Sequence, residues 1–269
     1  TSNLNALALL AELTDRPIAE VGTTMYRPQF LPVTLGAVGG GQVGGLYAPA
    51  RQLPAHRWHV AHGAELDDYG GWNRPACYRR AGESRAIAIE REVRAVRGAL
   101  GLLDASPLGK IELRGRDAVT LLDRIYVNNA TTLQPGQVRH GLMLNENGIV
   151  IDDGVFACLA PEHYLVSTTA ANGERIAAWL EEWQQCEWPD LELVQLSVTT
   201  QWAVLTLAGS SARTGLQGLD GDIDFTAEAF PHMSIRCGRL GGRLDGMPVR
   251  VQRVSFTGEL SYEISVPAD

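Results

Sequence analysis

Two adjacent carboxylates, Asp152 and Asp153, are the residues whose type and position best fit a chemical role. They follow the apolar run at 149–151 and precede Gly154. Neighbouring side chains on a strand point to opposite faces of the sheet, so one carboxylate is expected to face a pocket if the strand continues through both. The alternative is a simple turn, which the composition Asp-Asp-Gly favours. The spacing leaves both interpretations open.

Three histidines recur at every third position, His56, His59 and His62, and Glu65 continues the spacing. On a helix these side chains would share a face and could bind a metal ion. The nearby Pro54 and Gly63, and the alternation of the histidines with apolar residues, favour an extended segment instead. We therefore expect packed, solvated or substrate-facing histidines and no metal site.

The glycine-rich segment GGGQVG at 39–44 matches the dinucleotide-binding pattern GxGxxG and follows a strand-like run. That pattern requires a helix to start at the loop, so that its first amides meet the pyrophosphate. Gly45 and Pro49 follow here and oppose a helix. The sequence therefore predicts a flexible linker at this position.

Composition excludes several classes of protein. The 269 residues carry a net charge of −8, which argues against nucleic acid or an anionic membrane as the main partner. No apolar run approaches the roughly 18 residues of a membrane helix, and no secretory signal is visible. The four cysteines are scattered without metal-ligand spacing, which fits a reducing, cytoplasmic location.

Hydrophobic periodicity predicts helices and strands in an order that is not a strict βα alternation. This order indicates an α+β fold, with mixed or antiparallel sheets covered by helices. The helix at 84–100 is expected to bury Ile89 and Val93, Asn172 is expected to cap a later helix, and 67–78 reads as a loop rich in aromatic residues. The main predicted helices are 3–13, 84–100, 118–125 and 172–185, and the main predicted strands are 109–114, 163–169, 191–199, 202–207, 247–255 and 260–266.

Several separated motifs, taken in order, resemble the folate-binding aminomethyltransferase family. That family includes the glycine-cleavage T-protein and the folate domains of sarcosine and dimethylglycine oxidoreductases. The resemblance covers roughly residues 47–269. The motifs are EREVR at 90–94, GLLDAS at 101–106, GK at 109–110, MLN at 143–145, Asp152-Asp153, FTGE at 256–259 and YEI at 262–264.

The N-terminal part is similar to the α subunits of heterotetrameric sarcosine oxidases. This likeness rests on NLNA at 3–6, EVGTT at 20–24, WHVAHG at 58–63 and Arg74-Pro75. It implies that residues 1–46 are the end of an upstream dinucleotide-binding domain plus a Gly-rich linker. Residues 47–269 would be a folate-binding domain that is incomplete at its C-terminus, and the chain is expected to be a fragment.

The resemblance implies an enzyme, a sarcosine oxidase that acts on the CH–NH bond of N-methyl amino acids. The chain would bind tetrahydrofolate and capture the methylene group of sarcosine as 5,10-methylenetetrahydrofolate. Expected partners are a flavin-bearing β subunit with γ and δ subunits, and FAD or FMN and NAD would be held mainly outside this segment. Two alternatives stay open: a T-protein-like aminomethyltransferase, and a non-catalytic scaffold with the same fold.

The resemblance also assigns site residues. Asp152 would assist proton and charge transfer at the folate nitrogen, with Asp153 supporting the strand end. Glu263 would accept two N–H groups from the pterin edge. His140 stands where the family usually has a Tyr, and the family's downstream Arg lies outside this chain. The other expected folate contacts are Leu108, Phe156, Thr168, Phe230 and Phe256, and no metal ligand is implied.

Overall fold

The structure, a computed structural model, describes residues 2–21, 50–244 and 246–268, and the chain divides into two compact units, residues 1–50 and 51–269. In the described part of the first unit, the predicted N-terminal helix is confirmed as α1 (Ser2–Thr14), and α2 (Ile18–Val21) follows it. The glycine-rich segment at 39–44 lies outside the described residues.

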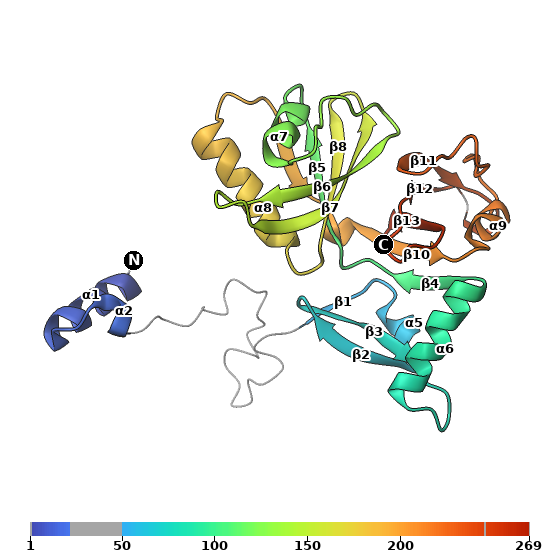
Figure 1. Ribbon diagram of the computed structural model, residues 1–269, viewed down its shortest axis with the longest axis horizontal. Helices are drawn as coiled ribbons and strands as arrows, with labels where there is room; N and C mark the ends of the chain where they lie inside the picture. Colours follow the sequence, from blue (N-terminus) through green and yellow to red (C-terminus); the bar gives the residue numbers. More distant parts are fainter. Residues whose placement is uncertain (1, 22–49, 245, 269) are drawn as a thin grey trace. The chain divides into compact units, whose positions relative to one another are not determined.

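The second unit contains the helices and strands that the family resemblance concerns (Figure 1). Its helical segments are α5 (His56–Ala61), α6 (Arg85–Gly98), α7 (Ala118–Ile125), α8 (Gly173–Glu182), the π-helical η2 (Trp183–Glu187), α9 (Ala212–Gln217), and the short 3-10 turns η3 (Thr199–Gln201) and η4 (Gly242–Leu244). Its strands are β1 (Arg51–Gln52), β2 (Ala64–Tyr69), β3 (Trp72–Tyr78), β4 (Gly101–Asp104), β5 (Gly109–Arg114), β6 (Val138–Leu144), β7 (Val150–Ala160), β8 (His163–Thr168), β9 (Val194–Ser197), β10 (Trp202–Ala208), β11 (Ser234–Leu240), β12 (Met247–Arg253) and β13 (Ser261–Pro267).

The strands form three sheets. A small sheet has the order β1-β3-β2, and two five-stranded sheets have the orders β11-β12-β13-β10-β4 and β6-β7-β8-β5-β9. We call the last two the β13 sheet and the β5 sheet. Neighbouring strands in both are antiparallel. The predicted α+β class with antiparallel sheets covered by helices is therefore confirmed.

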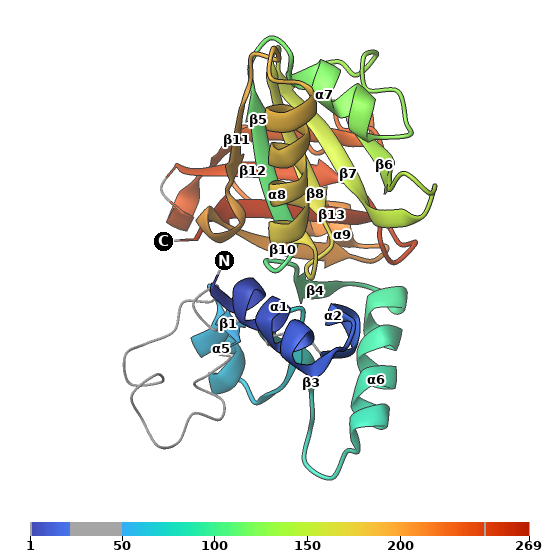
Figure 2. The ribbon, with the colours of Figure 1, turned by 90° about the vertical axis from the view of Figure 1, so that its left-hand side faces the viewer.

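Each five-stranded sheet buries one face under helices. Alternate residues of β5, Ile111 and Leu113, point into a core with Ile176 and Leu180 of α8, and Figure 2 shows α8 lying across this sheet. The β13 sheet buries Tyr262, Ile264 and Val251 in a second core with α9. The opposite faces of the two sheets meet in a third apolar cluster, which joins Ala157 and Leu165 to Ile235 and Val254. We call these opposite faces the inner faces.

Helix α6 forms where it was predicted, but its expected apolar face is not buried. Ser84 accepts a hydrogen bond from the Ile87 amide at 3.3 Å and so caps the helix start. Ile89 and Val93 are 40% and 47% exposed, whereas Ala88 is buried. The prediction of the buried face was therefore wrong.

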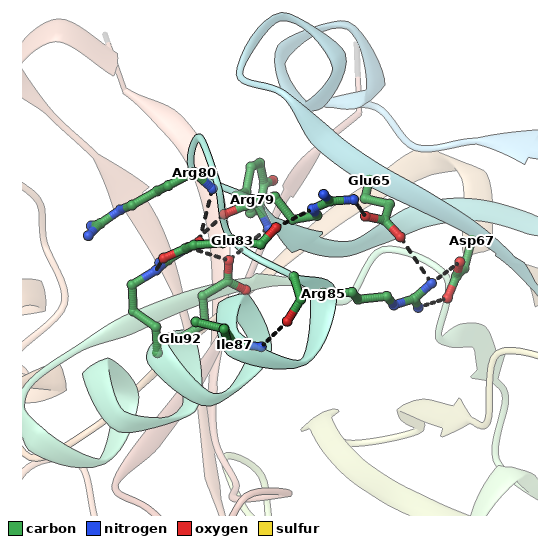
Figure 3. A network of polar contacts seen from close by, with 11 residues as sticks. Glu65, Asp67, Arg79, Arg80, Glu83, Arg85, Ile87 and Glu92 are labelled. Atoms are coloured by element: carbon green, nitrogen blue, oxygen red, sulfur yellow. Dashed lines mark hydrogen bonds and ion pairs between the residues drawn. The ribbon is translucent and has the colours of Figure 1, made fainter.

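Charge contacts explain the orientation of α6. The Arg91 guanidinium donates to Glu83 Oε1 at 2.9 Å and to the Tyr78 carbonyl at 2.7 Å. Arg85 pairs with Asp67 of β2 (Figure 3). Hydrogen bonds from Arg91 and from the backbone lower the pKa of Glu83 to about 2. These contacts fix the charged side of the helix against the β2–β3 hairpin, and the apolar stripe faces outward.

Two further predictions about the segment 56–78 were wrong. His56–Ala61 is a short helix, and 67–78 belongs to the β2–β3 hairpin, which tertiary pairing stabilises although the sequence favours a loop. His59 Nε2 lies 2.9 Å from Asp104 Oδ2, and His59 Nδ1 lies 2.6 Å from the Tyr78 hydroxyl. The described residues contain no cluster that could hold a metal ion, and none of their helices is long and apolar enough to cross a membrane.

Candidate functional site

Glu263 lies on the inner face of the β13 sheet. Strand β13 runs between β10 and β12, and Glu263 is paired with Thr206 on one side and with Gln252 on the other. Its chain neighbours Tyr262 and Ile264 point the opposite way, into the core under α9. Because directly paired residues share a face, the Glu263, Gln252 and Thr206 side chains form one polar row.

A charge pair between the sheets shows what faces this row. Arg250, two residues before Gln252 on β12, donates to Glu112 Oε1 of β5 at 2.7 Å. Lys110 is two residues before Glu112 and therefore lies on the same inner face of the β5 sheet. The register thus brings Lys110 to the side of the β5 sheet that faces Glu263.

Lys110 is a buried ammonium group that the sequence-based prediction missed. Its side chain is only 4% exposed, and Nζ donates to the carbonyls of Ser106 at 2.9 Å and Leu108 at 2.7 Å. Ser106 Oγ in turn accepts from the Val204 amide of β10 at 3.0 Å. These contacts hold the ammonium near β10, whose Thr206 is the direct neighbour of Glu263. The alternation in β5 indicated that Lys110 and Glu112 share one face of the strand. A strand face with charged residues usually points to solvent, so the sequence did not indicate a buried ammonium group.

Burial and mutual attraction set the protonation of this pair. Burial raises the pKa of Glu263 to about 7, against the opposing effect of the Lys110 charge. Burial also lowers the pKa of Lys110 to about 8, opposed by Glu263 and Asp104. Among the described residues, burial and the Lys110 charge act on the Glu263 carboxylate, and no hydrogen bond to it contributes. A half-buried, unpartnered carboxylate beside a buried cation can accept hydrogen bonds from a ligand.

Gln252 is the second polar group of the row without a partner. It is 3% exposed, and its Oε1 has no hydrogen-bond partner among residues 2–21, 50–244 and 246–268. No local pattern in the sequence pointed to this residue, because its role depends on its register with Glu263.

The adjacent Asp152 and Asp153 point to opposite faces of the β5 sheet. Asp152 is 4% exposed and lies on the α8 side, where it accepts from Thr169 Oγ1 at 2.5 Å, the Thr169 amide at 3.2 Å and Asn172 Nδ2 at 3.0 Å. Asn172 stands at the N-cap position of α8 as predicted, but its side chain makes no capping bond and donates to Asp152. Among the described residues, it is therefore Asp152 that makes the hydrogen bonds fixing this strand end.

Asp153 is the carboxylate on the inner face. It is 55% exposed, and its Oδ2 lies 3.5 Å from Nε2 of His140, which is 57% exposed. His140 is paired with Val155 of β7, which packs against the apolar cluster between the sheets. Asp153, His140 and Lys110 therefore share the inner face, whereas the predicted catalytic Asp152 does not.

The remaining predicted folate contacts do not converge. Phe156 is fully buried on the α8 side and stacks on Tyr126 with ring centroids 4.5 Å apart, and Thr168 is buried on the same side. Phe230 is fully buried in the core under α9, and Phe256 is 92% exposed in the β12–β13 loop. Among these five residues, only Leu108 contacts the inner-face groups, through its carbonyl on Lys110.

Two surface hollows are not lined by the residues of this row. One is lined by Arg139 and Arg236, and the other by Arg253 and Ser255. Neither is lined by Glu263 or Asp153, so the chemistry of the inner faces, and not the size of a hollow, identifies the candidate site.

Comparison with known families gives two matches. A family model described as "GCVT N-terminal domain" matches residues 55–269, and one described as "Sarcosine oxidase A3 domain" matches residues 1–42. The chain is 41% identical over 270 residues to the sarcosine oxidase subunit alpha of Corynebacterium sp. strain U-96, covering all of this chain and 28% of that protein.

A second group of relatives has a different name. The chain is 30% identical over 218 residues to the aminomethyltransferase of Thermotoga petrophila, covering 81% of this chain and 55% of that protein. The solved structure of the glycine cleavage system aminomethyltransferase T from Bartonella henselae matches with a TM-score of 0.66 and 24% identity, over 81% of this chain and 54% of that one. That likeness concerns the fold. The chain therefore spans between about a quarter and about half of the length of these relatives.

Proposed function

Since residues 55–269 belong to the GCVT N-terminal domain family, we propose that the inner face around Glu263 binds tetrahydrofolate, a reduced folate. The observation that carries the proposal is the half-buried Glu263 carboxylate, which has no hydrogen-bond partner among the described residues and faces the Lys110 ammonium. An unpaired buried carboxylate is costly in a folded protein, and a ligand that donates two hydrogen bonds offsets that cost.

The groups present fit a pterin ring. A pterin edge carries two adjacent N–H donors, and an ionised carboxylate can accept both at once. Glu263 supplies that carboxylate, and Lys110 favours its ionised form. Gln252, whose Oε1 has no partner among the described residues, lies directly beside it and offers a further polar group to the same ring.

Tetrahydrofolate, when bound, supplies the two nitrogens, N5 and N10, that take up a methylene group to give 5,10-methylenetetrahydrofolate. A carboxylate of this chain would stabilise the positive charge on the reacting nitrogen and accept its proton. Asp152 is the residue that the family resemblance assigns. The structural observations favour Asp153, since it is half exposed on the inner face, whereas both oxygens of Asp152 already accept hydrogen bonds.

The methylene group would come from sarcosine. This part of the proposal is supported by the 41% identity to a sarcosine oxidase subunit alpha and by the A3-domain match at 1–42. A flavin-bearing β subunit would oxidise the N-methyl amine, γ and δ subunits would complete the assembly, and FAD or FMN and NAD would bind mainly outside this segment. A glycine-cleavage aminomethyltransferase is the alternative, because the aminomethyltransferase relatives are 30% identical over 81% of the chain, and the match at 1–42 favours the oxidase.

Calorimetry with folinate, a stable reduced folate, tests the binding site. Glu263→Gln keeps the volume of the side chain but removes two charged hydrogen bonds, so we expect affinity to fall about 10- to 100-fold. Glu181→Gln, at an exposed position of α8 whose carboxylate accepts from Gln185 at 2.8 Å, is the control and should bind like the parent chain. Equal folinate affinity in the Glu263→Gln variant would remove the basis of the proposal.

Two variants distinguish the roles of Asp152 and Asp153. In the chain assembled with its flavin-bearing partner, Asp153→Asn should release the one-carbon unit as free formaldehyde while folinate binding is retained. Asp152→Asn should instead lower the unfolding temperature, because the N–H groups of the new amide would lie against the donors of Thr169 and Asn172. If capture is lost only in a well-folded Asp152→Asn variant, the original assignment to Asp152 stands.

A further inference from the structure

Gln252 is held in a position that the folded chain alone does not use. It is 3% exposed on β12, and Oε1 has no partner in the described part of the chain. An unpaired buried amide is unfavourable compared with an apolar side chain of similar size, so its presence calls for a role.

Another glutamine of the same unit, Gln195, also has an Oε1 without a partner among the described residues, and it differs from Gln252 in the bonds of its amide nitrogen. The Gln195 amide nitrogen donates to the Leu180 carbonyl at 3.1 Å and to Gln184 Oε1 at 2.7 Å, and these bonds tie β9 to α8. Among the described residues, the Gln252 amide nitrogen forms no bond comparable to those of Gln195, and its Oε1 has no partner. It is therefore not a structural link between elements.

The position of Gln252 relative to Glu263 indicates what it can contact. The two residues are Cα partners in the β12–β13 pairing, so their side chains leave the same face from Cβ atoms about 5 Å apart. A ring that places two N–H donors on the Glu263 carboxylate has its neighbouring edge atom within reach of the Gln252 amide. In a pterin, the atom next to the N3–H group on that edge is the 4-oxo oxygen, which accepts hydrogen bonds.

We propose that the Gln252 amide donates a hydrogen bond to the 4-oxo group of the pterin and so makes the site specific for 4-oxo over 4-amino pteridines. This inference rests on the proposed folate function and extends it to a specificity-determining residue. A glutamine amide can present either its nitrogen or its oxygen by rotation about its last torsion, and the 4-oxo group selects the nitrogen.

Two ligands that differ at the 4-position, folic acid and its 4-amino analogue aminopterin, provide the test. By calorimetry, Gln252→Leu should weaken binding of folic acid about 3- to 10-fold and change aminopterin binding less than about 2-fold. The ratio of the two affinities isolates the contact, because any change at Glu263 caused by the 4-amino group is common to both proteins. Gln195→Leu is the control and should leave the ratio unchanged.

The outcomes separate this inference from the folate proposal. If the parent chain binds neither folic acid nor folinate, the proposed function itself fails. If the parent chain binds folic acid but Gln252→Leu weakens both ligands equally, or neither, the specificity role is refuted. Gln252→Met, which keeps the side-chain length, is the second variant should Gln252→Leu fold poorly, and the same change in the affinity ratio is required of it.

Discussion

Two charge pairs lie between the same two sheets, and they differ in the hydrogen bonds that their carboxylates accept. Glu112 of β5 accepts hydrogen bonds from Arg250 at 2.7 Å, Arg114 at 2.8 Å and His163 at 3.0 Å. Burial alone would raise the pKa of Glu112, but the bonds from Arg114 and Arg250 outweigh it and hold the pKa at about 2. Glu263, facing Lys110, has no such bond, and burial raises its pKa to about 7.

The difference separates a structural pair from a binding pair. Glu112 is saturated by donors of this chain and can contribute only to the packing of the sheets. Glu263 and Lys110 keep hydrogen-bonding capacity that the described residues do not satisfy. Buried ionisable groups with perturbed pKa values cluster at functional sites, and within this unit the unsatisfied pair has the properties of such a site.

The largest expected effect comes from breaking the structural pair. Glu112→Gln leaves Arg250 buried without its counter-charge, so we expect a loss of about 3–5 kcal/mol in the free energy of unfolding at neutral pH. The low pKa of Glu112 means that its stabilisation is present above about pH 4.5 and is lost as the pH falls towards 2. Urea unfolding at neutral and acidic pH measures this. Equal stability of parent and variant at neutral pH would contradict the structural role.

An intermediate effect is expected from removing the cation of the binding pair. Lys110→Met takes away the charge that favours ionised Glu263, so the Glu263 pKa should rise further above 7. Folinate affinity near neutral pH should then fall about tenfold and recover towards about pH 9, because the ionised carboxylate is the acceptor. Calorimetry across this pH range, with Lys110→Arg as the charge-retaining control, distinguishes a shifted Glu263 pKa from misfolding of the variant. If folinate affinity depends on pH in the same way in the parent and in Lys110→Met, Lys110 does not set the Glu263 pKa.

The smallest expected effect is a gain in stability from Glu263→Gln. A folded-state pKa raised to about 7 means that the stability contributed by Glu263 is complete below about pH 4.5 and is lost as the pH rises through 7. Gln resembles the protonated form, so the variant should match the parent in stability near pH 5. Near pH 8 its free energy of unfolding should exceed that of the parent by about 1 kcal/mol. Thermal unfolding at both values tests this, and lower stability at pH 8 would contradict it.

Local patterns in the sequence predicted many of the elements. Strand 109–114 and helix 118–125 were predicted with the bounds that β5 and α7 have, because both carry a clear apolar periodicity. The β2–β3 hairpin and β11 were missed, since these strands are stabilised by pairing with the next strand along the chain and not by the propensity of their own residues. Helix α6 was found, but its buried face was misjudged because ion pairs to β2 and to the segment before the helix override its apolar stripe.

The sequence by itself determined the α+β class and the family, and it pointed to Asp152, Asp153 and Glu263 as residues of interest. Only the tertiary structure decided which of them share a face. Lys110 and Glu263 are more than 150 positions apart, and their approach depends on the strand registers of two sheets and on the Arg250–Glu112 contact between them. Local periodicity encodes the alternation of faces within one strand, but it does not encode which strand lies opposite, because that is set by long-range pairing.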